Sequence, residues 1–264
     1  MAFNLKVARI QGINLYLHWT FWLLPLWVIL TWRDDELFPL WMYLSLIALL
    51  FVCVVLHEFG HALMAREFGI RTRNIILSPL GGMAQMERMS QKPWEEFCIA
   101  VAGPLVNVVI AAVLGGVYLA GAIVAPGMIE TTAWQFLGLL VGLNVVMILF
   151  NMIPAFPMDG GRVLRAILSS SMGILKGTRV AVAIGTVLAI ILGAAGLLLL
   201  GNPWLPVIAL FVVMAGRQEL AMLEATERRR RAEEQGALPL MDITFRLWDP
   251  VRRTWVHHTH KDGA

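Results

Sequence analysis

The stretch that decides the fold is LFPLWMYLSLIALLFVCVVLHEFGH, residues 37–61, in which twenty uncharged residues lead directly into two histidines and a glutamate. About 20 such residues are enough to cross a bilayer as a helix. On that helix His57 and His61 lie four residues apart on one face and can bind one Zn²⁺, with Glu58 beside them as a base. Because ionisable groups in a span are costly, the cluster predicts a buried metal that activates water. The alternative is that the two histidines bond only to carbonyls at the helix end.

The composition predicts an all-α polytopic membrane protein. Apolar residues make up 58% of the chain and charged residues 15%, against about 25% charged in soluble domains, and the mean hydropathy is +0.71. Gly201, Asn202 and Pro203 divide the last apolar stretch into a hairpin, so we expect about six transmembrane helices. The uncharged stretches that are long enough to span are 11–32, 37–56, 97–129, 131–158 and 180–216.

The positions of lysine and arginine predict the orientation of these spans. Lysines and arginines lie before the first span, between the second and third spans, after the fourth span and after the last. The alternating loops contain only one such residue, Arg33. Positive residues stay on the cytoplasmic side, so both termini are expected there. The net charge of +3 then reflects topology, and the expected partner is the lipid bilayer and not nucleic acid. The first apolar run is expected to be a retained span and not a signal peptide.

One aspartate is expected to complete the metal site. A catalytic zinc commonly takes three protein ligands, and Asp159 is the aspartate expected at the depth of His57 and His61. Pro154 and Pro157 exclude a regular helix directly before Asp159, so the chain can turn there and direct the Asp159 carboxylate back. The alternative is that Asp159 only caps a helix or stabilises a turn. The other aspartates fall in the opposite loop or the polar tail: Asp34, Asp35, Asp242, Asp249 and Asp262. The glutamates on the same side are expected in solvated ion pairs: Glu67, Glu87, Glu95 and Glu96.

Three motifs follow one another along the chain: HEFGH at 57–61, AGPLVN at 102–107 and FNMIPAFPMDGGR at 150–162. In this order they resemble the site-2 protease family of zinc intramembrane metalloproteases, above all its bacterial six-span branch, which includes the sporulation factor processing protease. The resemblance covers about residues 5–216. It implies the following roles: zinc ligands His57, His61 and Asp159, general base Glu58, and Asn151 as a polar group near the reacting carbonyl.

By this resemblance the chain is expected to be a zinc endopeptidase with one Zn²⁺ per chain. It would cut the transmembrane segment of a membrane-protein substrate near the cytoplasmic face of a bacterial-type cytoplasmic membrane. A metal-binding scaffold or transporter that hydrolyses nothing is the alternative, and Glu58 argues against it because metal binding alone needs no base. One departure is PMDG at 157–160 in place of the family's Asn-Pro-Asp-Gly. That form resembles a subgroup often followed by paired CBS domains, which residues 217–264 do not resemble.

Residues 73–86 are predicted to form a small membrane-dipping β-hairpin. They place β-type residues around Pro79 and the pair Gly81-Gly82, between the HEFGH motif and the third span. An exposed edge there is expected to take the substrate by strand addition, and an ordinary connecting turn is the alternative. His18, in the first apolar run, is expected to be a hydrogen-bonded interface residue or to line the cavity.

Two domains are expected. Residues 1–216 would form the intramembrane metalloprotease domain, and residues 217–264 a cytoplasmic charged helix and a short tail. The tail is predicted to contain a small hairpin around Asp249-Pro250. Its partner, like the oligomeric state of the protein, does not follow from the sequence.

Overall fold

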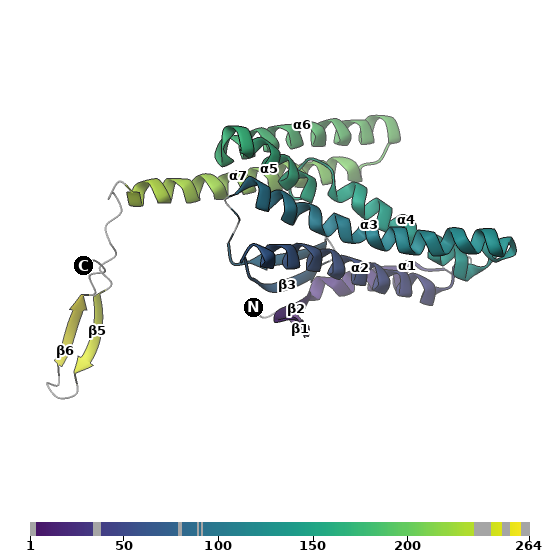
Figure 1. Ribbon diagram of the computed structural model, residues 1–264, viewed down its shortest axis with the longest axis horizontal. Helices are drawn as coiled ribbons and strands as arrows, with labels where there is room; N and C mark the ends of the chain where they lie inside the picture. The colour runs from purple at the N-terminus through teal and green to yellow at the C-terminus, as the bar shows by residue number, and fades with distance from the viewer. Residues whose placement is uncertain are drawn as a thin grey trace. The chain divides into compact units, whose positions relative to one another are not determined.

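The computed structural model describes residues 4–33, 38–78, 81–88, 90, 92–234, 244–249 and 254–259 (Figure 1). The chain forms two compact units, Met1–Arg217 and Gln218–Ala264. The first unit contains a four-stranded sheet and the helices up to and including the first part of helix α7 (Trp204–Glu234). The second unit contains the rest of α7 and a two-stranded sheet.

Five helices in the described residues are long and apolar enough to cross a membrane. They are α2 (Leu40–Glu67), α3 (Pro93–Val124), α4 (Thr132–Asn151), α6 (Ile174–Leu200) and α7 (Trp204–Glu234). Their exposed surfaces are rich in Leu, Ile and Val, as expected where lipid replaces water. A 3-10 turn, η2 (Pro126–Glu130), joins α3 to α4, and the shorter amphipathic α5 (Asp159–Met172) lies between α4 and α6. The prediction of a mostly helical, multi-pass membrane protein is confirmed.

The prediction that residues 11–32 form a single spanning helix is wrong. This stretch consists of strand β2 (Ile13–His18), a 3-10 turn, η1 (Trp19–Trp22), and helix α1 (Leu23–Thr31). A helix of 9 residues is about 14 Å long, which is less than half of the roughly 30 Å of a bilayer core. Asn14 and Tyr16 alternate with the buried Ile13 and Leu15, which is the period of a strand. Because neither polar residue is charged, the absence of charge over residues 11–32 does not distinguish this strand from a spanning helix.

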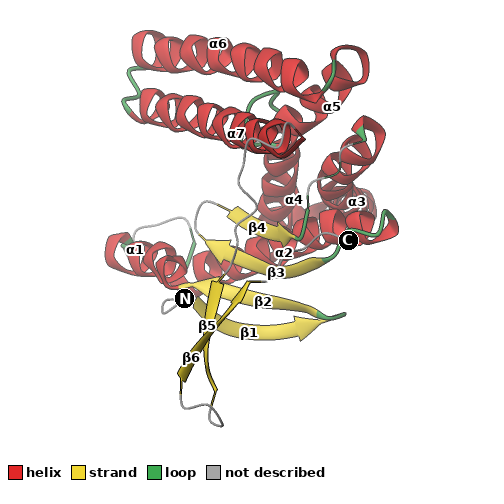
Figure 2. Ribbon diagram, turned by 90° about the vertical axis from the view of Figure 1, so that its left-hand side faces the viewer, coloured by secondary structure: helices red, strands yellow, loops and turns green. Residues whose placement is uncertain are grey.

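The sheet of the first unit has the strand order β1-β2-β3-β4 (Figure 2). Strand β1 (Asn4–Ile10) is antiparallel to β2, β2 is parallel to β3 (Thr72–Ser78), and β3 is antiparallel to β4 (Gly81–Met86). The last pair is the hairpin predicted over residues 73–86. Among the described strands β1 and β4 form the two edges, so each has one row of backbone groups that is not paired within this sheet.

The sheet packs against the second half of α2. Ile13, Leu15, Ile75 and Leu77 bury their side chains in one cluster with Ala62 of α2. The parallel register places β2 and β3 side chains of the same face next to one another, so a single apolar face meets the helix. This contact holds the β3–β4 hairpin beside the HEFGH motif.

Helices α6 and α7 form the hairpin predicted around residues 201–203. Gly201 has a φ of 60°, the Asn202 N–H donates to the Gly196 carbonyl (3.0 Å), and the Asn202 side chain accepts from the Trp204 N–H (2.9 Å). Helix α7 continues without a break across residue 216, and it includes the charged residues from 217 to 234 that were predicted to be helical. In the second unit, β5 (Thr244–Asp249) and β6 (Thr254–Thr259) form the predicted tail hairpin, while Pro250 lies outside the described residues.

Candidate metal centre

The last turns of α2 carry the HEFGH motif, residues 57–61, and fix it against α3. Helix α2 ends at Glu67, and the φ of 70° at Gly69 lets the Ile70 N–H donate back to the Ala65 carbonyl (2.9 Å). Ala65 and Ile70 are buried together with Ile99 of α3. Because the motif precedes this anchored end by less than two turns, its side chains have a defined position relative to α3.

Asp159 is the first residue of α5 and follows the irregular segment 152–158. A Cβ added at Gly160 would collide with the backbone of this segment, and one added at Gly161 would lie 2.7 Å from the Ala155 backbone carbon. The glycine pair therefore lets α5 begin directly against the segment. This close packing turns Asp159 toward α2, as its proline-rich approach predicted.

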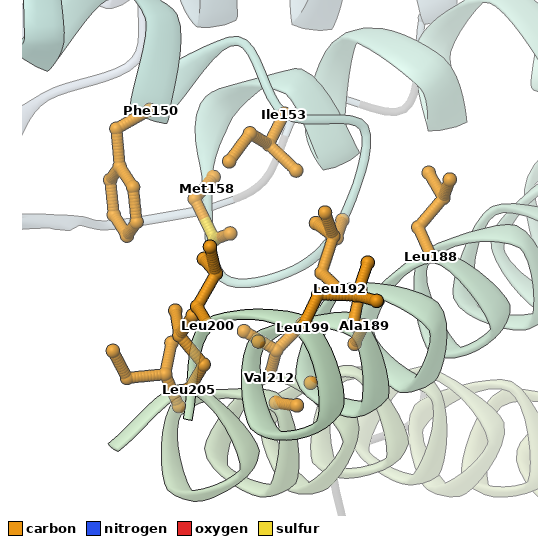
Figure 3. Close-up of a pocket in the computed structure, with 16 residues that line it drawn as sticks. Phe150, Ile153, Met158, Leu188, Ala189, Leu192, Leu199, Leu200, Leu205 and Val212 are labelled. Carbon is orange, nitrogen blue, oxygen red and sulfur yellow. The ribbon is translucent and has the colours of Figure 1, made fainter. Parts of the chain in front are cut away.

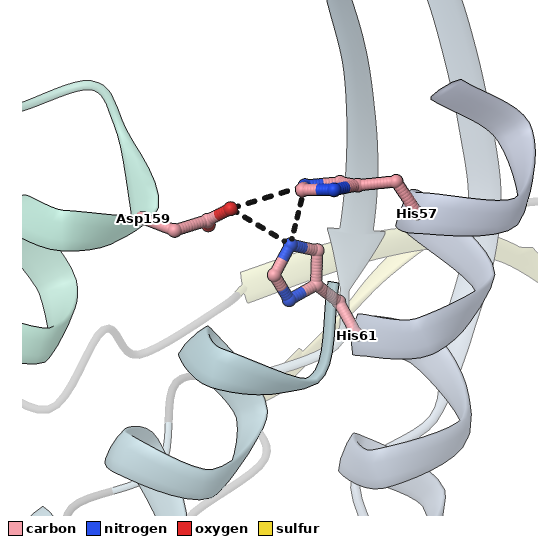
Figure 4. A group of neighbouring side chains, drawn as sticks. All are labelled: His57, His61 and Asp159. Carbon is pink, nitrogen blue, oxygen red and sulfur yellow. Dashed lines mark hydrogen bonds and ion pairs between the residues drawn. The ribbon is translucent and has the colours of Figure 1, made fainter. Parts of the chain in front are cut away.

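The structure brings the side chains of His57, His61 and Asp159 together (Figure 4). Nε2 of His57, Nε2 of His61 and Oδ2 of Asp159 form a triangle in which each side is 3.1 Å. All three residues are buried. Ligands at 2.0–2.1 Å from a tetrahedral zinc lie about 3.3 Å apart, so this donor set has the size and the atom types of a zinc site.

The other ring nitrogens explain why these three atoms face one another. His61 Nδ1 donates to the Ile99 carbonyl (2.6 Å), which can only accept, and His57 Nδ1 lies 2.9 Å from Asn107 Oδ1. Both neutral rings then present a lone pair on Nε2, beside the carboxylate oxygen. Three electron-pair donors at this separation repel one another unless a cation lies between them. The arrangement therefore fits a metal ion better than histidines that bond only to carbonyls.

Helix α3 makes room for both rings at Gly103. A Cβ there would overlap the His61 ring and lie 2.8 Å from Nε2 of His57. Pro104, which follows, has no N–H to donate within the helix. The AGPLVN motif thus has a physical explanation, because its glycine makes space for the imidazoles and its Asn107 binds one of them.

Glu58 is buried and borders the edge strand β4 at Gly82. A Cβ at Gly82 would lie 2.8 Å from the carboxyl carbon of Glu58 and 2.9 Å from its Oε1. A glycine is needed here because any side chain would displace the Glu58 carboxyl group. The backbone of β4 therefore passes directly beside the candidate base.

Asp159 also lies near a cation, since Nη1 of Arg162 is 3.9 Å from its Oδ1. Burial raises the pKa of the Asp159 carboxyl, the charge of the Arg162 guanidinium lowers it, and the net pKa is below its ordinary value. The carboxyl group is therefore ionised at neutral pH. Ionisation is what metal binding requires of it.

Asn151 and His18 lie outside this group. The Asn151 amide donates to the Met147 carbonyl of its own helix (2.9 Å), and within the described residues no hydrogen bond joins it to the three donors. His18 Nδ1 lies 2.6 Å from the Thr20 hydroxyl, so His18 is a hydrogen-bonded residue.

The expectation of solvated ion pairs is wrong for Glu96. Its carboxylate accepts hydrogen bonds from Nε (2.7 Å) and Nη2 of Arg165, and the two residues are 4% and 1% exposed. The Arg165 guanidinium also lies over the Phe156 ring, 5.1 Å from its centre. Glu87, in contrast, pairs with Arg73 on the surface as expected. The buried pair joins α3 to α5.

Sequence reasoning missed two residues behind the metal centre, Asn107 and Asn144. Both are 0% exposed, and Asn107 contacts His57 directly. A signal was available, because an amide in the middle of an otherwise apolar span is costly and marks a functional position.

An apolar cavity of about 420 Å³ lies between α6, α7 and the segment that leads into Asp159 (Figure 3). Ile153, Ala155 and Met158 of that segment form one wall. Apolar walls offer no ligand for a cation. His57, His61 and Asp159 are not among the residues that line this cavity.

Comparison with known proteins gives a consistent result. The profile of Peptidase family M50 matches residues 45–126 and 118–194, a region that contains the HEFGH motif and Asp159. The solved structure of a site-2 protease from Methanocaldococcus jannaschii has a TM-score of 0.59 and 39% sequence identity, and the match covers 83% of this chain and 95% of that chain.

Two curated relatives extend the comparison. The zinc metalloprotease MJ0392 of M. jannaschii is 40% identical over 226 residues, which are 85% of this chain and 62% of that protein. Stage IV sporulation protein FB of Bacillus subtilis is 29% identical over 136 residues, which are 51% of this chain and 44% of that protein. The chain thus spans about three fifths of the length of MJ0392. From its family profile and its structural match, the chain belongs to peptidase family M50, the site-2 protease family.

Proposed function

We propose that the protein is a zinc-dependent intramembrane endopeptidase that hydrolyses a peptide bond in or near the transmembrane segment of a membrane-protein substrate, close to the cytoplasmic face. The observation that carries this proposal is the triangle of His57, His61 and Asp159 donor atoms with 3.1 Å sides. Membership of family M50 supports the same chemistry. In this proposal residues 1–216 form the protease domain and both termini are in the cytoplasm of a bacterial-type cell. Five spanning helices alone would place the termini on opposite sides, so η1 and α1 with their flanking residues would have to complete a sixth crossing.

His57, His61 and Asp159 would hold the zinc, which when bound supplies Lewis-acid activation of a water molecule and of the scissile carbonyl. Glu58 takes the proton from the attacking water on a carboxylate oxygen. It returns that proton to the leaving nitrogen as the carbon–nitrogen bond breaks. We assign Asn151 to a hydrogen bond with the developing oxyanion, for which its amide must exchange the Met147 carbonyl for the substrate.

The substrate is proposed to bind as an extended strand along β4. A helical substrate hides its carbonyls in internal hydrogen bonds, so it must unwind before attack. Within the described sheet β4 is an edge strand, and its Gly82 lies against Glu58. A strand paired with this edge would therefore have its backbone beside the candidate base.

Replacing any one ligand should remove the zinc. We expect His57→Ala, His61→Ala and Asp159→Ala to bind zinc at least about 100-fold more weakly than the wild type, because the loss of a ligand exceeds the 10- to 100-fold effect of removing a ligand's hydrogen-bond partner. Zinc content and affinity can be measured on the detergent-purified protein. His18→Ala is the matched control, since His18 bonds to Thr20 outside the cluster. Undiminished zinc in Asp159→Ala would refute the assignment of the third ligand.

Proline in β4 should stop cleavage without releasing zinc. Proline has no N–H, so it removes a donor either to the substrate or to β3, depending on the position. We expect proline at Met83, Ala84 or Gln85 to damage cleavage of a membrane-protein reporter severely, while leucine at Met83 has a mild effect. Val7→Pro is the control, because Val7 lies at the irregularity in β1, on the opposite edge of the sheet. If all three β4 variants cut normally while folded and zinc-loaded, β4 is only a connector.

A further inference from the structure

A chain of buried amide side chains leads from His57 of α2 through α3 into α4. Oδ1 of Asn107 lies 2.9 Å from Nδ1 of His57, and Nδ2 of Asn107 donates to Oδ1 of Asn144 (3.2 Å). Nδ2 of Asn144 donates to the Leu140 carbonyl (2.9 Å) and lies 3.5 Å from Sγ of Cys53. Both asparagines are 0% exposed, so bulk water does not compete for these bonds.

The Leu140 carbonyl, at the end of this series of hydrogen bonds farthest from His57, determines the direction of every bond in the series. The Leu140 carbonyl can only accept, so Asn144 must present its NH₂ group there and its oxygen to Asn107. Asn107 must then present its NH₂ group to Asn144 and its oxygen to His57. An amide turned the other way would place two donors or two acceptors face to face at a site without water.

We propose that Asn107 and Asn144 are positioning residues that hold His57 in the tautomer with its proton on Nδ1, so that Nε2 keeps the lone pair that binds the metal. The proposal rests on the proposed function, because it assigns a role toward the zinc of that same site. Neither asparagine touches the donor triangle, and both act through His57. His61 obtains the same tautomer from a backbone carbonyl, that of Ile99.

The two histidines therefore differ in how they can be disturbed. No side-chain substitution removes the Ile99 carbonyl, whereas a change at Asn107 frees Nδ1 of His57. Without an acceptor at Nδ1 the ring can carry its proton on Nε2 and turn away from the metal. Removing such an outer partner typically weakens metal binding by about 10- to 100-fold.

The test is zinc affinity of the full-length, detergent-purified chain, measured by competition with a chromophoric chelator. We expect Asn107→Leu, which has a similar size and no polar atom, to bind zinc about 10- to 100-fold more weakly than the wild type. Asn107→Asp should recover most of this loss, because its carboxylate still accepts from Nδ1 of His57. Asn144→Leu should show a smaller loss. Cobalt absorption spectra report whether the coordination changes with the affinity.

A merely structural role for the asparagines predicts a different pattern. Thr178→Val is the matched control: it removes a fully buried hydroxyl that donates to the Ile174 carbonyl within α6, and it should leave zinc affinity unchanged. Ring ¹⁵N NMR of the zinc-depleted wild type tests the tautomer without any substitution, and it should show the His57 proton on Nδ1. A proton on Nε2 in that spectrum would overturn the proposal.

His57→Ala separates this proposal from the proposed function. If His57→Ala loses zinc while Asn107→Leu keeps wild-type affinity and the wild-type cobalt spectrum, the positioning role is wrong and the metal centre stands. If His57→Ala itself keeps zinc at wild-type affinity, the proposed metal centre is wrong and the positioning role falls with it.

Discussion

Replacing Glu58 with glutamine is expected to leave zinc bound and to lower the rate of substrate cleavage by about 10²- to 10⁴-fold. Glutamine has nearly the size of glutamate, so it fills the same space beside Gly82. Its amide cannot take a proton from the attacking water at neutral pH, so the chemical step loses its base. Zinc content and single-turnover cleavage of a membrane-protein reporter, measured on one purified sample, separate binding from chemistry.

The matched control is Glu67→Gln, because Glu67 is the last residue of the same helix and is exposed. It loses the same charge and should cleave at the wild-type rate. Comparable turnover by Glu58→Gln and the wild type would contradict the hydrolytic mechanism. That result would favour a metal-binding scaffold or transporter, which needs the three ligands and no base.

The parts of the site that lie close together in sequence were predictable. Two histidines four residues apart share one helix face whatever the rest of the chain does, so local geometry alone predicts that they meet. Asp159 was predictable for a different reason, because the chain offers no other aspartate at the same depth. The structure brings Asp159 to both histidines, and its role as a ligand remains a proposal.

The parts that depend on contacts between distant segments were not predictable. Hydropathy does not distinguish a strand of uncharged residues from a helix, and the first apolar run therefore concealed β2 and the parallel sheet. The sequence does not show whether a charged side chain is buried, so Glu96 was expected on the surface. Its buried partner Arg165 lies 69 residues away in the sequence, and nothing local indicates the pair. The partners of Asn107 likewise lie on two other helices.

Breaking the buried Glu96–Arg165 pair is expected to have the largest effect on stability. Arg165→Met should lower the free energy of unfolding by about 3–5 kcal/mol, because it leaves the Glu96 carboxylate buried without its cation. Unfolding of the purified protein by heat and by denaturant measures this loss. Because α5 begins at Asp159, about 9 Å along the helix axis from Arg165, the same variant should also bind zinc more weakly.

The chain contains a matched control for this prediction. Nε of Arg73 lies 2.7 Å from Oε1 of Glu87, the same distance as in the buried pair, but the Arg73 side chain is 74% exposed. Arg73→Met should therefore cost no more than about 1 kcal/mol. The double variant Glu96→Leu with Arg165→Met removes both buried charges and should recover most of the lost stability. If Arg165→Met and Arg73→Met have equal effects, burial does not determine the strength of the pair, and the attachment of α5 to α3 must come from apolar packing alone.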